Sequence, residues 1–235
     1  MIKYIRIGGL QMNKIFDYEK DLVNNFKKTY FNNKSCILID EMPIRWGNID
    51  VVSITNTILP FTKAQLSVLS NPTSAKLFLK TKKNRPITEK SLIRNIGASE
   101  NTCKTAIRNL LKNTLIEKKN NLYYRAIDFT FPKVIISGYE AKLTDYNKAF
   151  FQSCLNRNYV DLSYIVFPLN ISNKIFEQHK DVLIENGIGL IGTSLNKSIT
   201  LLKAQKQTDI KDYLRLLNLI QSQINILKNK VALSQ

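Results

Sequence analysis

The spacing of apolar residues changes twice along the chain, and this change constrains the fold more than any other feature. Before residue 63 and after residue 129, short runs of branched residues typical of strands alternate with segments typical of amphipathic helices. The strand-like runs cover 36–40, 48–54, 134–143, 162–169, 187–193 and 197–203, and the helix-like segments cover 17–30, 146–159, 173–185 and the C-terminal region. This alternation predicts an α/β fold, a mixed sheet flanked by helices.

The intervening residues 63–129 have a different pattern of consecutive helical segments followed by a hairpin. Thr88 and Ser99 stand where N-caps of two helices are expected, and Gly97 between them permits a tight turn. We therefore expect an inserted all-helical or winged module at 63–129 inside a discontinuous domain formed by 1–62 and 130–235.

The strong positive charge of the chain indicates which kinds of partner it can bind. The 235 residues carry a net charge of +17, which favours binding to polyanions such as nucleic acid, although solubility alone could also explain it. No apolar run approaches the roughly 18 to 20 residues needed to cross a membrane, and the first residues do not resemble a signal peptide. We expect a cytoplasmic protein whose three cysteines are buried thiols.

Three charged residues on strand-like segments form a pattern suited to phosphodiester hydrolysis. Glu140 and Lys142 are two positions apart, so both side chains project from one face of their strand. Asp50 lies on the preceding strand of the predicted sheet and meets them if the two strands pair antiparallel. Carboxylates are the ligands that Mg²⁺ prefers, and a lysine can orient or activate a water. An isolated Glu-x-Lys is also common on exposed strand edges.

The run from Asn48 to Val52, the segment Gly138-Tyr-Glu-Ala-Lys-Leu143 and the helix and strand that follow resemble the PD-(D/E)xK nuclease superfamily, which has a restriction-endonuclease-like core. The resemblance implies a metal-dependent deoxyribonuclease using Mg²⁺, or Mn²⁺ in its place. It implies that Asp50 and Glu140 bind the metal and that Lys142 orients the attacking water. It further assigns supporting roles to Glu19 on the first helix and Gln152 on the later helix, and a peripheral one to Glu41. No proline precedes Asp50, and the insertion is longer than the usual turn.

Residues 91–125 closely resemble the winged helix-turn-helix of bacterial repressors, except that Thr114 replaces a glycine common before the wing. The resemblance implies that the third helix enters the major groove of double-stranded DNA. Its outward side chains would then contact DNA, as would the tip of the wing: Glu100, Asn101, Lys104, Thr105 and Arg108 on the helix, and Lys118, Lys119 and Asn120 on the wing. A module used for packing or dimerisation is the alternative.

The C-terminal segment carries apolar residues at alternating steps of three and four, a heptad pattern. These residues are Ile210, Tyr213, Leu217, Ile220, Ile224, Leu227 and Val231. The pattern predicts either a homodimer, which would bring two cleavage sites to opposite DNA strands, or packing on the rest of the chain. The additional apolar residues Leu214 and Leu216 widen the stripe and favour packing within the chain.

The sequence therefore predicts a site-selective DNA endonuclease, with restriction or defence, mobile-element processing and repair all open as its biological role. A DNA-binding regulator with a degenerate, non-cleaving core and an RNA-directed nuclease remain the alternatives. His179, the one histidine, has no companion residue expected of a His-dependent nuclease, so we interpret it as a solvated helix residue.

Overall fold

The computed structural model describes residues 4–7, 10–13, 15–44, 47–55 and 57–232. These residues form two compact units. The first unit combines the N-terminal part of the chain, up to residue 56, with residues 135–210. The second combines residues 57–134 with the C-terminal segment from residue 211. Each unit therefore contains two stretches that are far apart in the sequence.

A six-stranded mixed sheet forms the centre of the first unit, with the order β11-β10-β9-β8-β4-β3. The antiparallel pairs are β3 with β4, β4 with β8, and β10 with β11, whereas β8, β9 and β10 run parallel. The bounds are β3 Cys36–Ile44, β4 Gly47–Thr55, β8 Ile136–Ala141, β9 Leu162–Pro168, β10 Gly189–Thr193 and β11 Ser198–Leu202. A separate hairpin, β1 (Tyr4–Ile7) with β2 (Leu10–Asn13), precedes them.

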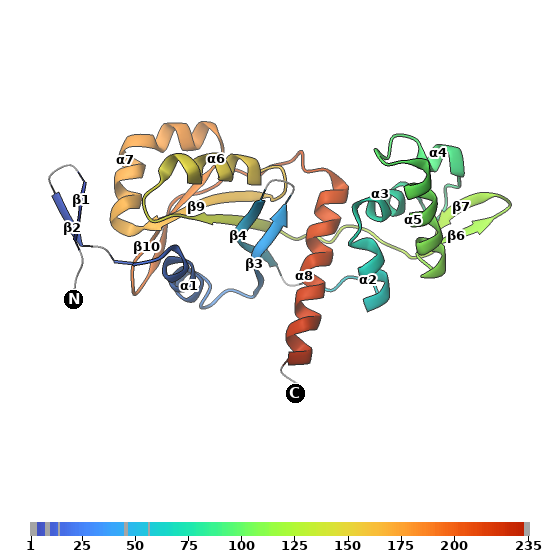
Figure 1. Cartoon of the computed structure of the whole chain (residues 1–235), viewed down its shortest axis with the longest axis horizontal. Helices are drawn as coiled ribbons and strands as arrows, with labels where there is room; N and C mark the ends of the chain where they lie inside the picture. The colour runs from blue at the N-terminus through green and yellow to red at the C-terminus, as the bar shows by residue number, and fades with distance from the viewer. Residues whose placement is uncertain (1–3, 8–9, 14, 45–46, 56, 233–235) are drawn as a thin grey trace. The chain divides into compact units, whose positions relative to one another are not determined.

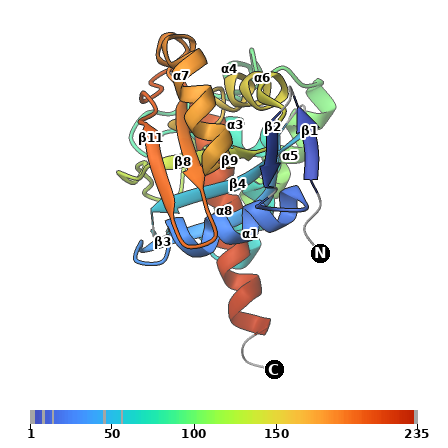
Figure 2. The ribbon, with the colours of Figure 1, turned by 90° about the vertical axis from the view of Figure 1, so that its left-hand side faces the viewer.

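Helices cover both faces of this sheet, as Figures 1 and 2 show, with α1 (Glu19–Tyr30) on one side and α6 (Tyr146–Asn156) with α7 (Leu169–Glu185) on the other. Alternate residues of β9 illustrate the two cores. Val166 belongs to the cluster on the α1 side, and Ile165 and Phe167 belong to the cluster on the α6 and α7 side. The central strands are apolar on both faces because a parallel sheet is covered on both sides.

The second unit is mainly helical. Its helices are α2 (Lys63–Leu69), α3 (Pro72–Lys80), α4 (Glu89–Ile93), α5 (Glu100–Lys112) and α8 (Asp212–Ala232), and its small sheet has the order β5-β7-β6. The strands are β5 (Ile87–Thr88), β6 (Ile116–Lys119) and β7 (Leu122–Arg125). The predicted N-caps are confirmed, since Thr88 Oγ1 accepts a hydrogen bond from Ser91 N and Ser99 Oγ accepts one from Thr102 N.

Two backbone positions of the second unit show why certain residues occur there. Gly97 adopts a positive φ of 76° before α5, as expected for the tight turn. Thr114 adopts a φ of 53° between α5 and β6, the left-handed conformation that favours glycine. The backbone thus keeps the turn that the sequence pattern suggested, although the side chain there is β-branched.

The terminal helix α8 differs from its predicted place. The sequence-based division put it with residues 130–211 and the sheet, but α8 contacts α2 and α3 and belongs to the second unit. Gln223 explains part of this: its Nε2 donates to Thr57 O at 2.8 Å and its Oε1 accepts from Leu59 N at 3.3 Å. Arg215 donates to Val134 O at 2.7 Å, so α8 is bonded to both ends of the segment 57–134.

The buried face of α8 is also rotated from the predicted heptad seam. Leu216, Leu219 and Ile220 are fully buried, whereas Leu227 is 37% exposed. Packing within the chain, one of the two expected outcomes, therefore accounts for the part of the apolar stripe nearest the start of α8. The homodimer remains a prediction.

The order of elements in and around the sheet is confirmed as predicted, namely helix, two strands, insertion, strand, helix, strand, helix and two strands. Element ends agree to within four residues, the largest differences being the end of β3, at Ile44 instead of Asp40, and the start of α7, at Leu169 instead of Asn173. The cysteines are free, and Cys103 is buried as expected, but Cys36 and Cys154 are only half-buried. Among the described residues, no helix is long and apolar enough to cross a membrane.

Packing of α1 on the sheet depends on Phe26, which is fully buried and contacts the rings of Tyr30, Phe31 and Tyr139 at centroid distances of 5.1 to 5.4 Å. We expect Phe26→Ala to lower the free energy of unfolding of the first unit by about 3 to 5 kcal/mol, because the cavity left behind cannot close fully. Urea unfolding measures this loss. Phe151→Ala is the matched control, because Phe151 is 63% exposed and its removal should cost little. Equal losses in the two variants would contradict the packing described.

Candidate functional site

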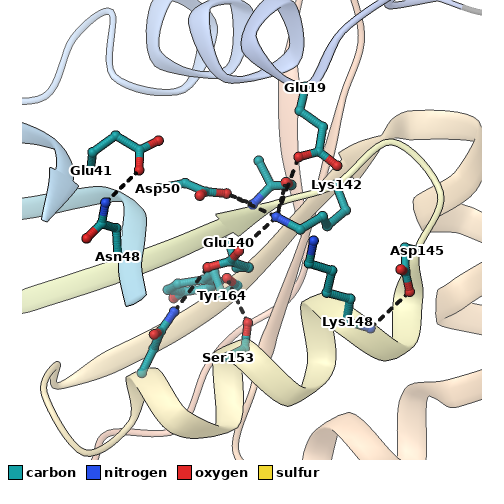
Figure 3. A network of polar contacts seen from close by, with 12 residues as sticks. Glu19, Glu41, Asn48, Asp50, Glu140, Lys142, Asp145, Lys148, Ser153 and Tyr164 are labelled. Atoms are coloured by element: carbon teal, nitrogen blue, oxygen red, sulfur yellow. Dashed lines mark hydrogen bonds and ion pairs between the residues drawn. The ribbon is translucent and has the colours of Figure 1, made fainter. Parts of the chain in front are cut away.

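The predicted catalytic residues meet at one end of the pairing between β4 and β8 (Figure 3). These strands pair antiparallel, with Val51 opposite Tyr139, so Asp50 and Glu140 follow as neighbours one step further along. Asp50 Oδ2 accepts a hydrogen bond from Ala141 N at 2.8 Å, which fixes its carboxylate against the strand that carries Glu140. The antiparallel pairing of β4 with β8 that the sequence analysis required is therefore present, whereas convergence of the two carboxylates on one metal ion remains a prediction.

Lys142 is the centre of the arrangement. Its Nζ lies 2.8 Å from Glu140 Oε1, 3.5 Å from Asp50 Oδ2 and 3.6 Å from Glu19 Oε2, and it donates to Ala141 O at 3.0 Å. Glu140 and Lys142 thus project from the same face, as their spacing predicted. Glu19, from the first turn of α1, is brought to the same ammonium group. Three carboxylates and one carbonyl oxygen therefore surround a single cation.

Burial makes this cluster electrostatically unusual. Glu140 is fully buried and Lys142 is 4% exposed. Burial, together with the negative charge of Asp50, raises the pKa of Glu140 to about 7, although the hydrogen bond from Lys142 opposes the rise. Burial opposes the charged form of Lys142, but its hydrogen bond with Glu140 and the charges of the three carboxylates outweigh burial and raise its pKa. Glu140 therefore retains a proton to a higher pH unless additional positive charge is supplied.

A cavity of about 300 Å³ adjoins the cluster and opens the site toward α1. Glu19 and Asp50 line it, together with Asp40 and Glu41 on β3. Glu41, predicted at the periphery, accepts a hydrogen bond from Asn48 Nδ2 at 3.3 Å and has a φ of 49°, which is strained for a glutamate inside a strand. Lys27 from α1 pairs with Asp40 at 2.8 Å on the wall of the same cavity.

Gln152 does not join the cluster, although the sequence assigned it a supporting role. Its Oε1 is buried and has no hydrogen-bond partner among the described residues. Asn156, one turn further along α6, takes that place, since its Nδ2 donates to Glu140 Oε2 at 3.4 Å and the residue is 2% exposed. Sequence reasoning missed Asn156. Its helical spacing of four from Gln152 was the signal that could have identified it.

The oxygen atoms of the cluster are chemically suited to a hard divalent cation. Mg²⁺ is commonly bound through one or two carboxylates while keeping several waters. Asp50 and Glu140 supply two carboxylates, and Ala141 a carbonyl oxygen, that all lie within 3.5 Å of Lys142 Nζ. Within the described part of the chain, no group of three or more histidine, cysteine, aspartate or glutamate side chains is placed to hold a metal ion. Asp50 and Glu140 could therefore hold such an ion together with water, but not within an all-protein cage.

His179, the other side chain considered for chemistry, stacks on the ring of Tyr146 with centroids 4.2 Å apart and planes 10° from parallel. It is a half-buried packing residue of α7 and not the solvated helix residue that the sequence suggested, because the Tyr146 ring covers one face of the imidazole.

The residues predicted to contact DNA all lie exposed in the second unit. Asn101, Lys104, Thr105 and Arg108 are on the face of α5 opposite to its buried residues. Lys104 pairs with Glu100 at 2.6 Å, and Arg108 donates to Thr105 Oγ1 at 3.1 Å.

Lys118 and Lys119 are on β6, and the turn itself is formed by Asn120 and Asn121, both with positive φ. Lys119 pairs with Glu117 at 2.8 Å, and the ammonium of Lys118 lies over the ring of Tyr123, 5.5 Å from its centroid. The two lysines therefore flank the turn of the hairpin instead of forming it.

Charge is distributed unevenly between the two units. The second unit holds 19 Lys and Arg against 5 Asp and Glu, a net charge of +14, whereas the first unit holds 16 against 13, a net charge of +3. Most of the excess charge of the chain therefore belongs to the unit that contains α5 and the β6–β7 hairpin, and the acidic cluster belongs to the nearly neutral one.

Comparisons with known proteins identify no relative with an established function. No protein-family model matches the sequence, and a search of curated proteins finds no match. Among solved structures, a protein of unknown function from Silicibacter pomeroyi aligns with a TM-score of 0.47 and 9% identity over 94% of each chain. A likeness at this level supports no functional conclusion.

The raised pKa of Glu140 predicts a pH dependence of stability. The ordinary value is 4.5 and the folded value is about 7, so between these the folded state binds more protons than the unfolded chain and becomes less stable as pH rises. Glu140→Gln removes this titration. We expect the stability of the variant, relative to the unchanged protein, to increase by about 3 kcal/mol between about pH 4 and about pH 8.

Urea unfolding across this pH range measures the difference. Glu177→Gln, on exposed α7 surface, is the control and should follow the unchanged protein at every pH. A constant difference between Glu140→Gln and the unchanged protein would contradict the buried, protonatable state of Glu140.

Proposed function

We propose that this protein is a divalent-metal-dependent endonuclease that hydrolyses phosphodiester bonds of double-stranded DNA, with a PD-(D/E)xK core and an inserted winged helix-turn-helix. One observation carries the proposal: the carboxylates of Asp50 and Glu140 and the ammonium of Lys142 meet within 3.5 Å at the junction of β4 and β8. A helix, three antiparallel strands, a second helix and a parallel strand surround this junction, and this order supports the proposal.

Each residue of the cluster has a definite task under this proposal. Asp50 and Glu140 would hold Mg²⁺ or Mn²⁺, which when bound supplies charge neutralisation and lowers the pKa of a coordinated water. Lys142 would orient the attacking water and stabilise the developing negative charge. Asn156 would hold the second oxygen of Glu140, so that the carboxylate keeps a single orientation. Glu19 would adjust the position of Lys142 from the opposite side of the site.

The second unit supports the DNA-binding half of the proposal through its charge and its order of elements. Three helices followed by a β-hairpin, with a short strand completing the small sheet, correspond to the winged helix-turn-helix pattern. Its net charge of +14 favours a polyanion by release of counterions. The exposed polar face of α5 would then contact base edges or phosphates in the major groove.

Plasmid DNA tests the catalytic half. We expect the purified protein to cleave it in the presence of Mg²⁺, and Glu140→Ala to reduce the cleavage rate at least about 1000-fold, because a metal ligand is removed. DNA binding, measured by gel shift, should persist because α5 is unaltered. Binding without cleavage by the unchanged protein would favour a non-cleaving regulator, and cleavage of single-stranded RNA in place of duplex DNA would favour an RNA-directed nuclease.

The ion pair between Glu100 and Lys104 gives a separate test of the DNA-binding face. We expect Lys104→Ala to weaken DNA binding about tenfold and to lower the salt dependence by about one charge. Glu100→Gln should tighten binding a few-fold, because it releases Lys104 from its partner. Neither change should reduce cleavage at saturating protein concentration. Opposite shifts in the two variants are the expected signature, and unchanged affinity in both would exclude this face of α5.

A further inference from the structure

The positive charge of Lys142 is already shared among the groups that surround it. Glu140, Asp50, Glu19 and the carbonyl of Ala141 all place an oxygen within 3.6 Å of its Nζ, and the side chain is 5% exposed. A phosphodiester entering this site carries one negative charge and gains more in the transition state of hydrolysis. A second cation that can reach the phosphate from outside the buried cluster would therefore stabilise the transition state.

Lys148 is a cation of this kind. In Figure 3 its side chain extends from the first turn of α6 toward Glu140 and Lys142. The residue is exposed, and within the described ranges its ammonium has no acidic partner within ion-pair distance. It approaches from α6, whereas Glu19 approaches from α1 on the other side of the sheet.

The position of Lys148 is not explained by the stability of its helix. Asp145 caps α6 by accepting a hydrogen bond from Lys148 N at 3.0 Å, so Lys148 lies three residues after the cap. Cations are disfavoured in the first turn of a helix, where the free N–H groups create a partial positive charge. Neither an ion pair nor the helix dipole accounts for a lysine here. An incoming anion, in contrast, would be attracted both by the ammonium of Lys148 and by the partial positive charge at the start of α6.

We propose that Lys148 binds a nonbridging oxygen of the scissile phosphate and stabilises the charge that develops on it. This inference rests on the proposed nuclease function. In the hydrolysis, a water oxygen forms the new bond to phosphorus, the bond to one ester oxygen breaks, and that oxygen leaves with a proton derived from water. Lys148 keeps its protons throughout. Its contribution is a charge-assisted hydrogen bond that strengthens as the phosphate becomes more negative.

Single-turnover cleavage of plasmid DNA, with protein in excess over DNA, separates this role from simple DNA binding. We expect Lys148→Ala to lower the cleavage rate at saturating protein about 100-fold, while the affinity for DNA measured by gel shift changes less than about threefold. Lys148→Arg should recover part of the rate, because it restores the charge. Lys197→Ala, an exposed lysine in the turn between β10 and β11, is the matched control and should behave like the unchanged protein.

The outcomes distinguish this inference from the function on which it rests. If the unchanged protein cleaves DNA and Lys148→Ala cleaves equally fast at saturation, the role of Lys148 is wrong and the nuclease stands. If Lys148→Ala loses affinity but reaches the full rate at saturation, the residue contacts DNA away from the scissile phosphate, which also overturns the inference. If the unchanged protein does not cleave nucleic acid with Mg²⁺ or Mn²⁺, both proposals fall together. Thermal unfolding of Lys148→Ala confirms that the exposed substitution leaves the fold intact.

Discussion

The buried contact between Lys142 and Glu140 is the interaction on which the rest of the site depends. An ammonium and a carboxylate 2.8 Å apart, with almost no exposure to solvent, require compensation for the water that they have lost. Asp50, Glu19, Asn156 and the backbone of Ala141 provide it. The cluster has three carboxylates around one ammonium group, so its negative charge is not fully balanced and would attract a further cation. Burying these charges costs desolvation free energy on folding. Such clusters are therefore more typical of functional sites than of groups that stabilise the fold.

The sheet makes this contact possible by its register. Antiparallel pairing of β4 with β8 brings residue 50 beside residue 140, and the alternation of side chains along β8 directs Glu140 and Lys142 toward the same side. Tyr139 precedes Glu140, and Ala141 lies between Glu140 and Lys142. Both point to the opposite face of the sheet and belong to the aromatic core under α1. A slip of one residue would exchange these two sets, placing the charged groups in that aromatic core and the tyrosine ring among the polar groups on the other face. The core on one face therefore secures the site on the other.

The insertion separates two electrostatic requirements. A site for a cation must be acidic, whereas a surface for a polyanion must be basic, and the two oppose each other when they share one surface. In this chain the basic charge is concentrated in the unit of 57–134 and the C-terminal helix, and the acidic cluster lies in the unit built on the large sheet. Under the proposed function, this division lets the protein attract DNA strongly without filling the cleavage site with its own cations.

Local sequence patterns determined the elements in and around the six-stranded sheet and their order, the N-caps at Thr88 and Ser99, and the placement of Glu140 and Lys142 on one strand face. Each of these depends on residues within a few positions of one another, so spacing and side-chain chemistry are enough to specify it. Tertiary structure decided that Asn156 and not Gln152 contacts Glu140, that α8 packs with α2 and α3, and that Lys148 extends toward the cluster. These outcomes depend on how a helix is rotated and which distant segment it meets, and amphipathic periodicity leaves both undetermined because many partners can bury the same apolar face.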